Sequence, residues 1–267
     1  MRIHHIGELR GQVLLFGGPY SNLPATQALL ARGQGMAKLC TGDVVAYGAD
    51  PMGCIAALRA ADVPVVAGNC ERQLAARAQD CGCGFDAGSV CGIAARGWFA
   101  HADAQVTAAA RAWMDGLPDI LTFDHSGRRF AAIHGGVSAI NRFLWSCSPE
   151  ADFRAELALL RAATGPVDAV IAGHSGIAFR RAVDGTEWIN AGVIGMPPHD
   201  GRPQTEYAVL SGGAVEFHRL DYDHFAAARA MEKAGLTQGY ETALITGYWP
   251  SQDILPDQLR LSPRANG

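Results

Sequence analysis

The fold is decided by residues 12–43, QVLLFGGPYSNLPATQALLARGQGMAKLCTGD. The short apolar run Gln12–Gly17 predicts a buried strand. Asn22 fits the N-cap of a helix with Pro24 in its first turn, so Asn22–Arg32 is predicted to be helical. Ala37–Thr41 then predicts a second strand. A strand, a helix and a strand in this order favour a parallel α/β sheet.

The same alternation continues and then changes into hairpins. Residues 71–100 are rich in Cys and Gly and are expected to be irregular. Later strands flank turn dipeptides such as Asp184-Gly185, which is typical of hairpins. Helices are predicted at Pro51–Ala61, Ala102–Met114, Pro149–Ala163, His224–Lys233 and Glu241–Ile245. Strands are predicted at Pro64–Ala67, Ile120–Asp124, Arg129–Ile133, Asp168–Ala172, Phe179–Val183, Thr186–Asn190, Tyr207–Leu210 and Ala214–Leu220.

No internal repeat or linker divides the chain. We expect one domain over residues 1–249, built of two packed mixed sheets with helices outside, and a loose polar tail over residues 250–267. With 49% hydrophobic residues, the 267-residue chain can bury a substantial core without disulfides.

Composition excludes several classes of function. The net charge of −4 argues against a general nucleic-acid-binding surface, which needs a concentrated basic excess. No apolar run reaches the roughly 18 residues that span a bilayer, and the N-terminus lacks a signal-peptide pattern. A cytoplasmic location is therefore expected. The seven cysteines are an odd number in a mid-sized chain, so reduced thiols are expected rather than a disulfide framework. The sequence leaves the oligomeric state open.

Polar side chains that can bind a metal follow four of the predicted strands. They are Asp43, Asn69, His134 and His174, each with a glycine beside it. Ligand sites of open α/β sheets lie at the carboxyl ends of the strands. One carboxylate, one amide oxygen and two imidazoles form a mixed set of nitrogen and oxygen donors suited to Mn²⁺, Zn²⁺ or Fe²⁺. A single buried histidine is more often structural than a ligand, so the prediction depends on all four residues together.

Around these residues the sequence resembles the calcineurin-like metallophosphoesterases, especially their small bacterial phosphodiesterase branch. The resemblance covers roughly residues 12–220 and follows the family's motif blocks in order. The matching segments are Phe16-Gly17-Gly18-Pro19-Tyr20-Ser21-Asn22-Leu23, Gly42-Asp43-Val44-Val45-Ala46-Tyr47-Gly48, Gly68-Asn69-Cys70-Glu71, His134-Gly135, Gly173-His174-Ser175-Gly176 and Ile189-Asn190-Ala191-Gly192-Val193-Ile194-Gly195. The resemblance implies a four-layer α-β-β-α sandwich of two mixed sheets.

It also implies a metal site of reduced composition. The family builds a two-metal site from two ligand sets, and one set carries over intact as Asp43, Asn69, His134 and His174. The other set needs ligands where this chain has Gly18, Tyr20 and Gly176. Glycine has no donor side chain, and tyrosine is a poor ligand at neutral pH unless a ferric ion deprotonates it. The expected cofactor is one divalent transition-metal ion.

The remaining candidate site residues follow from the same motifs. Cys70 stands at the family's catalytic histidine position, although a neutral thiol is a poor general acid. Tyr20 either donates a hydrogen bond to a phosphate or plugs the cavity, and Asn22 follows in the same block. Arg72 either contacts a phosphate or is an exposed residue at a helix start. His199, in the loop Pro197–Pro203, either contacts substrate or lies on a plain surface loop.

The four clustered cysteines and the two N-terminal histidines could be functional, but each group also has a simpler structural explanation. Cys70, Cys81, Cys83 and Cys91 could bind a metal or act as redox-sensitive thiols, but their spacing lacks the usual Cys-x2–4-Cys pairs. Small apolar residues that pack a loop are the simpler explanation. His4 and His5 precede the first predicted strand and are expected on the surface.

Two functions of different class follow. The first is a metal-dependent hydrolase of phosphomonoesters or phosphodiesters with a single-ion site. The second is a catalytically inactive family member that acts as a phosphate-ligand sensor or a protein-interaction module. Only the family resemblance favours the hydrolase over the inactive sensor or interaction module. In both cases the expected partner is a small phosphorylated ligand or substrate.

Overall fold

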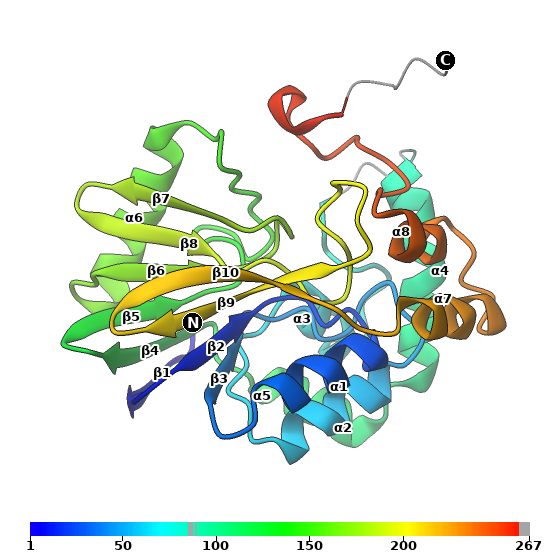
Figure 1. Cartoon of the computed structure of the whole chain (residues 1–267), viewed down its shortest axis with the longest axis horizontal. Helices are drawn as coiled ribbons and strands as arrows, with labels where there is room; N and C mark the ends of the chain where they lie inside the picture. Colours follow the sequence, from blue (N-terminus) through cyan, green and yellow to red (C-terminus); the bar gives the residue numbers. More distant parts are fainter. Residues whose placement is uncertain (85–87, 89, 262–267) are drawn as a thin grey trace.

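The computed structural model describes residues 1–84, 88 and 90–261. Its strands form two mixed sheets that face each other (Figure 1). The six-stranded sheet has the order β1 (Ile3–Glu8), β4 (Ile120–His125), β5 (Arg128–Ala132), β6 (Ala169–Ala172), β8 (Thr186–Asn190) and β7 (Phe179–Val183). The four-stranded sheet has the order β10 (Ala214–Leu220), β9 (Thr205–Ser211), β2 (Val13–Phe16) and β3 (Ala37–Cys40).

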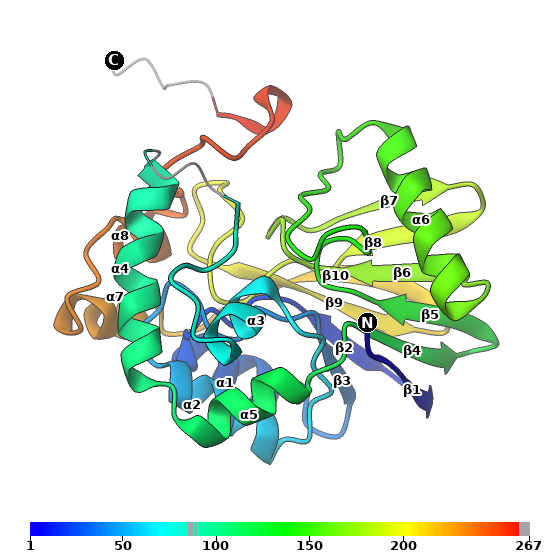
Figure 2. The same cartoon turned by 180° about the vertical axis from the view of Figure 1, so that it is seen from behind.

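Helices cover the outer faces of both sheets. Figure 2 shows α6 lying over the six-stranded sheet, with the other helices gathered beyond the four-stranded one. In chain order the helices are α1 (Leu23–Arg32), α2 (Pro51–Ala60), α3 (Asn69–Ala75), α4 (Val90–Gln105), α5 (Ala108–Gly116), α6 (Glu150–Thr164), α7 (His224–Lys233), α8 (Tyr240–Thr246) and the short 3-10 helix η1 (Asp257–Leu259). The result is the four-layer α-β-β-α arrangement expected from the sequence.

Alternation along the strands builds three apolar cores between these layers in the described part of the chain. In β2, Val13 and Leu15 pack into the core between the two sheets, whereas Leu14 and Phe16 face the helices. In β6, Ile171 joins the core between the sheets, while Val170 packs with the α6 residues. Successive side chains of a strand point to opposite faces, so continuous apolar runs are needed where both faces are buried.

Most predicted elements are confirmed, and the differences have physical causes. Pro64–Ala67 is not a strand: only Val65 bridges Cys40 in parallel. Residues 71–100, which are expected to be irregular, contain the end of α3 and most of α4. The helix predicted at Ala102–Met114 is split at Val106, where the Thr107 side chain accepts a hydrogen bond from the Ala110 amide and starts α5.

The N-terminal segment also differs from expectation. His4 and His5 lie within β1, which pairs in parallel with β4, rather than before the first strand. In the C-terminal segment Leu255 is 1% exposed, and Pro250 and Ile254 line a pocket, whereas Leu261 is 42% exposed. Residues 262–267 lie outside the described part. Among the described residues, none of the helices has the length and apolar character needed to cross a bilayer.

Candidate metal centre

The four predicted ligand residues meet at one edge of the facing sheets. Asp43 follows β3, His134 follows β5 and His174 follows β6, while Asn69 is the first residue of α3. β2 and β3 run parallel, as do β5 and β6, so these strands deliver their following residues to the same edge. All four side chains are buried: Asn69 is 1% exposed and His174 is 8% exposed.

Their ligand atoms converge closely. His134 Nε2 lies 3.3 Å from Asp43 Oδ2, 3.1 Å from Asn69 Oδ1 and 3.0 Å from His174 Nδ1. Atoms bound about 2.0–2.2 Å from one ion lie about 3.0–3.6 Å from each other. Asp43, His134 and His174 form the one group of three acidic, histidine or cysteine ligands found to converge in the described residues. Together with the Asn69 oxygen, they could hold a single transition-metal ion.

Neighbouring groups orient the two ambiguous side chains. His134 Nδ1 donates to the carbonyl oxygen of Thr41 at 2.7 Å, which turns Nε2 toward the centre. The Asn69 amide nitrogen donates to the carbonyl of Cys81 at 2.8 Å and to Cys83 Sγ at 3.2 Å, so its oxygen points inward. Both side chains are therefore presented as ligands before any ion binds.

The protonation states of Asp43 and His174 suit a cation. Burial would raise the pKa of Asp43, but the adjacent His134 and His174 hold it below its usual value, so the carboxylate is ionised. Burial would lower the pKa of His134, yet Asp43 raises it above its usual value, so a metal ion would displace a proton from this imidazole. Burial, helped by the charge of His134, lowers the pKa of His174 to about 3, so this imidazole is neutral and its lone pair is available.

A buried glutamate, Glu71, fixes the Asp43 loop. It is fully buried and accepts hydrogen bonds from the backbone amides of Asp43 at 2.8 Å, Gly68 at 2.9 Å and Val45 at 3.2 Å. Burial and the nearby Asp43 carboxylate raise the pKa of Glu71 to about 7. A Cβ on Gly68 would lie 2.2 Å from Asp43 Oδ1, so only glycine fits there. Sequence reasoning missed this role, although Glu71 closes the Gly-Asn-x-Glu block.

A buried asparagine holds the His174 loop in the same way. The Asn190 amide nitrogen donates to the Gly173 carbonyl at 2.7 Å and to Ser175 Oγ at 2.8 Å, and its oxygen accepts from the Gly192 amide at 3.0 Å. His174 itself has a φ of 61°, a backbone conformation that residues other than glycine rarely adopt. Asn190 therefore stabilises the strained residue that carries a candidate ligand.

Aromatic rings occupy the space beside Gly18 and Gly176. A Cβ on Gly18 would lie 2.5 Å from Tyr20 Cζ, and a Cβ on Gly176 would lie 3.7 Å from Trp249 Cζ2. Burial raises the pKa of the Tyr20 phenol well above its usual value, and the charge of Asp43 raises it further. Tyr20 is thus a neutral phenol packed against Gly18, and a longer side chain at position 176 would meet Trp249.

The polar atoms of Arg72 and Asn22 have protein partners away from the ligand atoms, and a substrate contact of either residue stays a prediction. The Arg72 guanidinium pairs with Asp119 at 2.6 Å and donates to the carbonyls of Asp115 and Leu117 at the end of α5. Asn22 is a helix cap, as its place before Pro24 suggested: its oxygen accepts from the Ala25 amide at 3.1 Å. Its nitrogen donates to the carbonyl of Gly195 at 3.1 Å.

Cys70 and His199 do not reach the pocket either. The Cys70 thiol is 1% exposed, and burial raises its pKa well above the usual value, so it stays protonated and supplies no useful acid. His199 is not among the pocket-lining residues; instead its Nδ1 accepts the Trp249 backbone N–H at 2.8 Å. His199 therefore positions Trp249, which does line the pocket.

We expect Asn22→Ala to lower the free energy of unfolding by about 1 kcal/mol, because the variant loses the α1 cap. Metal content should stay unchanged, since Asn22 does not face the ligand atoms. Urea denaturation followed by circular dichroism, together with metal analysis, checks both expectations. Weaker phosphate binding at unchanged stability would return Asn22 to the substrate-binding residues.

The cysteine cluster does not assemble a thiolate metal site in the described residues. Cys70, Cys81 and Cys83 are free and buried, and they do not form a converging ligand group. Burial raises the pKa of Cys70, and hydrogen bonding to Cys70 followed by burial raises that of Cys83, so these thiols stay protonated. The side chain of Cys91 lies outside the described part. Instead, the Cys81 carbonyl oxygen and the Cys83 thiol accept hydrogen bonds from Asn69 and orient its side chain.

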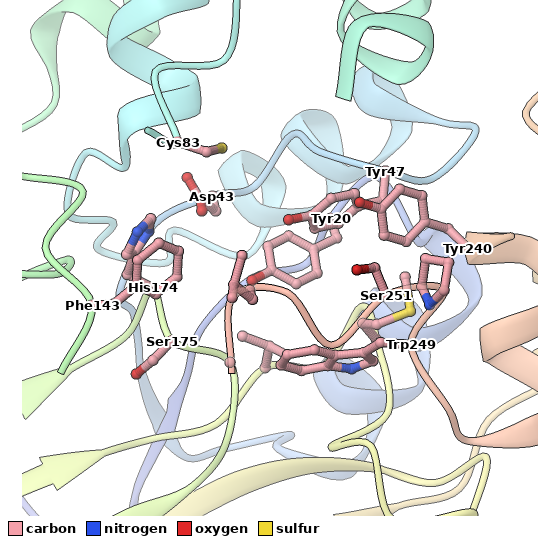
Figure 3. A pocket seen from close by; sticks show the side chains of 15 residues that line it. Tyr20, Asp43, Tyr47, Cys83, Phe143, His174, Ser175, Tyr240, Trp249 and Ser251 are labelled. Atoms are coloured by element: carbon pink, nitrogen blue, oxygen red, sulfur yellow. The ribbon is translucent and has the colours of Figure 1, made fainter. Parts of the chain in front are cut away.

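A pocket opens directly beside the ligand residues (Figure 3). Asp43, His174 and Phe143 lie on one side of the view, and the rings of Tyr20, Tyr47, Tyr240 and Trp249 gather on the other. The full lining is Tyr20, Asp43, Tyr47, Cys83, Phe143, His174, Ser175, Gly176, Val193, Met196, Tyr240, Trp249, Pro250, Ser251 and Ile254. The candidate ligands therefore border an aromatic cavity.

Comparison with known proteins identifies the family and the fold. A sequence model of the calcineurin-like phosphoesterase superfamily domain matches residues 21–212. No curated protein matches the sequence. The crystal structure of a metallophosphoesterase from Sphaerobacter thermophilus superposes with a TM-score of 0.71 at 21% identity, covering 89% of this chain and 99% of that one. A hypothetical protein from Pyrococcus horikoshii OT3 gives a TM-score of 0.71 at 15% identity, covering 90% and 98%. At these identities the structures show a shared fold.

The family match spans more than half of the chain and includes Asp43, Asn69, His134 and His174, and both structural relatives share the fold. The chain therefore belongs to the calcineurin-like phosphoesterase superfamily.

Proposed function

We propose that the chain is a metal-dependent hydrolase of phosphoesters whose centre holds one divalent transition-metal ion. The observation that carries the proposal is the convergence of Asp43 Oδ2, Asn69 Oδ1 and His174 Nδ1 on His134 Nε2, at 3.0–3.3 Å. Two imidazole nitrogens, a carboxylate and an amide oxygen suit Mn²⁺, Zn²⁺ or Fe²⁺.

A single ion is favoured because the other half of the family's ligand set has no donors here. Gly18 and Gly176 have no side chains, and the Tyr20 ring fills the space that a side chain at position 18 would enter. Since burial raises the pKa of Tyr20, the residue is not a phenolate ligand for a second divalent ion.

The chain's own residues would orient the reaction. A bound ion supplies Lewis acidity, which activates water and polarises a phosphoryl oxygen. Asp43 provides the negative charge that holds the ion, while Glu71 and Asn190 fix the loops that carry Asp43 and His174. Because Cys70 replaces the family's acid and is buried, the leaving oxygen receives no proton from that position. We therefore expect turnover that is orders of magnitude slower than in two-metal relatives.

The partner we propose is a small phosphorylated compound, because the centre borders a closed-in pocket rather than a broad charged surface. A cytoplasmic location stays a prediction.

Hydrolysis of bis(p-nitrophenyl) phosphate and of p-nitrophenyl phosphate tests the activity. We expect Mn²⁺- or Zn²⁺-dependent release of p-nitrophenol that chelator abolishes and that His174→Ala lacks. Release that is equal in the variant and the wild type would refute catalysis at this centre. Metal-dependent phosphate binding without turnover would instead favour the second function, that of a phosphate-ligand sensor.

A separate experiment tests whether the Tyr20 ring fills the space beside Gly18. Gly18→Asp should lower the free energy of unfolding by about 1–3 kcal/mol, because its Cβ meets the Tyr20 ring and its φ is 38°. In a Tyr20→Ala background the cost should fall by about 1 kcal/mol. Gly127→Asp is the matched control, since its φ is 74° and its Cβ meets nothing within 4 Å. Equal costs of Gly18→Asp in both backgrounds, measured by urea denaturation, would mean that Tyr20 does not fill this space.

A further inference from the structure

The C-terminal segment Trp249–Leu261, which we call the strap, forms one wall of the pocket beside the candidate ligands. Its lining residues are Trp249, Pro250, Ser251 and Ile254. Figure 3 shows Trp249 and Ser251 on the side of the pocket away from His174. The family match ends at residue 212, so the strap lies beyond the matched domain. The candidate ligands and this wall therefore come from different parts of the chain.

The strap leaves little room beside the ligand atoms. The pocket has a volume of about 50 Å³, which is space for a few water molecules. Sites that hold small organic ligands are several times larger, at roughly 300–1,000 Å³. A phosphorylated compound with an organic group therefore enters only if one wall of the pocket moves.

The walls that follow the sheet strands are held in place. Val193, which follows β8, forms a parallel bridge with Gly17, which follows β2. The Ser175 hydroxyl, which follows β6, donates to the Leu144 carbonyl at 2.7 Å. Movement of these residues would disturb the sheet edge that carries the candidate ligands, so the strap is the wall that can move at the lowest cost.

Trp249 attaches the start of the strap to the rest of the domain. Its indole N–H donates to the Pro197 carbonyl at 2.7 Å, and its backbone N–H donates to His199 Nδ1 at 2.8 Å. Cζ2 of its ring lies 3.7 Å from the place that a Cβ on Gly176 would take. Both hydrogen bonds come from one residue, so a single substitution weakens the attachment.

Beyond its first residue, most hydrogen bonds of the strap run within the strap. The Gln252 side chain accepts from the Leu261 amide at 2.7 Å. The Leu255 amide donates to the Gln252 carbonyl at 3.0 Å, and Arg260 Nε donates to the Leu255 carbonyl at 2.9 Å. Gln252 also lies beside the His199 ring. A segment that satisfies most of its own hydrogen bonds can open as a unit while the rest of the domain stays folded.

A glycine lies where such a segment needs a hinge. Gly247 ends α8 with a φ of 76°, two residues before Trp249. Glycine changes its backbone angles at less steric cost than other residues, and hinges lie at the ends of elements. Rotation at Gly247 therefore moves the strap without moving α8.

We propose that the strap closes the metal centre and must move away, by rotation at Gly247, before a phosphorylated ligand can enter. The proposal rests on the proposed function for the kind of ligand, but the opening itself needs neither metal nor turnover. The candidate ligands stay at the sheet edge during this movement. The hydrogen bonds of Trp249 then set how often the centre is accessible.

Hydrogen exchange followed by mass spectrometry tests the opening in the full-length protein. We expect the amides of residues 249–255 to exchange faster than those of β2 and β6, yet more slowly than in an unfolded peptide of the same sequence. Exchange as slow as that of β2 would show that the strap opens only when the domain unfolds. Exchange at the unfolded rate would show that the strap is not closed. Either result would overturn the proposal.

Two variants test the attachment. Trp249→Phe keeps an aromatic ring but loses the indole N–H, so we expect exchange of the strap to become about two- to tenfold faster, with β2 unchanged. His199→Leu removes the acceptor of the Trp249 backbone N–H and should act in the same direction. Trp113→Phe on α5 is the matched control and should leave the strap unchanged. Unchanged exchange in both test variants would contradict the attachment through Trp249.

Removal of bound Zn²⁺ by a chromophoric chelator tests whether the strap controls access to the centre. We expect Trp249→Phe to release Zn²⁺ to the chelator about two- to tenfold faster than the wild type, in step with its exchange. Faster exchange with unchanged release would show that the strap moves without controlling access, and would refute the proposal. A wild type that binds no Zn²⁺ would refute the proposed function, while the exchange measurement still decides whether the strap opens.

Discussion

Replacing His134 by alanine is expected to lower the affinity for Zn²⁺ and Mn²⁺ at least about a hundredfold. His134 Nε2 lies within 3.3 Å of the ligand atoms of Asp43, Asn69 and His174, so its removal takes away the central donor of the set. Structural sites bind Zn²⁺ with roughly 10–16 kcal/mol, shared among about four ligands, and a hundredfold loss is about 2.7 kcal/mol. Competition titration with a chromophoric chelator measures the change.

The variant should also lose metal-dependent turnover. Asp43 loses its charged neighbour, so we expect a lower free energy of unfolding for the metal-free variant. His125→Ala is the matched control: this histidine is 1% exposed, donates to the Gly11 carbonyl at 2.8 Å and lies away from the ligands. It should cost stability and leave metal affinity unchanged. An unchanged affinity in His134→Ala would remove His134 from the ligand set.

Replacing Glu71 by glutamine is expected to lower the free energy of unfolding by about 2–3 kcal/mol. One carboxylate oxygen accepts from the amides of both Asp43 and Gly68, at 2.8 and 2.9 Å, and the other accepts from Val45 at 3.2 Å. The glutamine amide nitrogen cannot accept, so at least one buried N–H loses its partner. Because Glu71 positions Asp43, metal affinity should fall by roughly ten- to a hundredfold as well.

Urea denaturation and chelator competition measure the two effects of Glu71→Gln. Glu216→Gln is the matched control, since this side chain is 82% exposed, and it should change stability by less than about 0.5 kcal/mol. If Glu71→Gln behaves like the control in both measurements, the carboxylate does not hold the Asp43 loop.

The convergence of the four candidate ligand residues could be predicted from the sequence because its signals are local. Asp43, His134 and His174 each end a strand-like run beside a glycine, and parallel strands deliver such residues to one edge. The apolar runs are equally local, which is why the layers and most strands were predictable. That these residues bind a metal stays a proposal.

Side-chain partners that are distant in sequence could not be predicted. Arg72 pairs with Asp119, 47 residues away, and the Asn22 side chain reaches Gly195, 173 residues away. His199 holds Trp249 across 50 residues. Local motifs suggested a phosphate contact at each of these positions. The tertiary hydrogen bonds that each side chain makes with these distant partners have no local signal in the sequence. The first half of helix α4 could not be predicted from the sequence, because it lies in a segment rich in Cys and Gly, which have low helix propensity.

Metal stoichiometry tests the central claim most directly. Freshly purified, untagged protein is measured by inductively coupled plasma mass spectrometry, before and after reconstitution with Mn²⁺ or Zn²⁺, with His174→Ala as the control. A single-ion centre predicts about one transition-metal ion per chain, lost in the variant. Two ions per chain would show that other side chains replace the missing ligands, and no bound metal after reconstitution would contradict the centre itself.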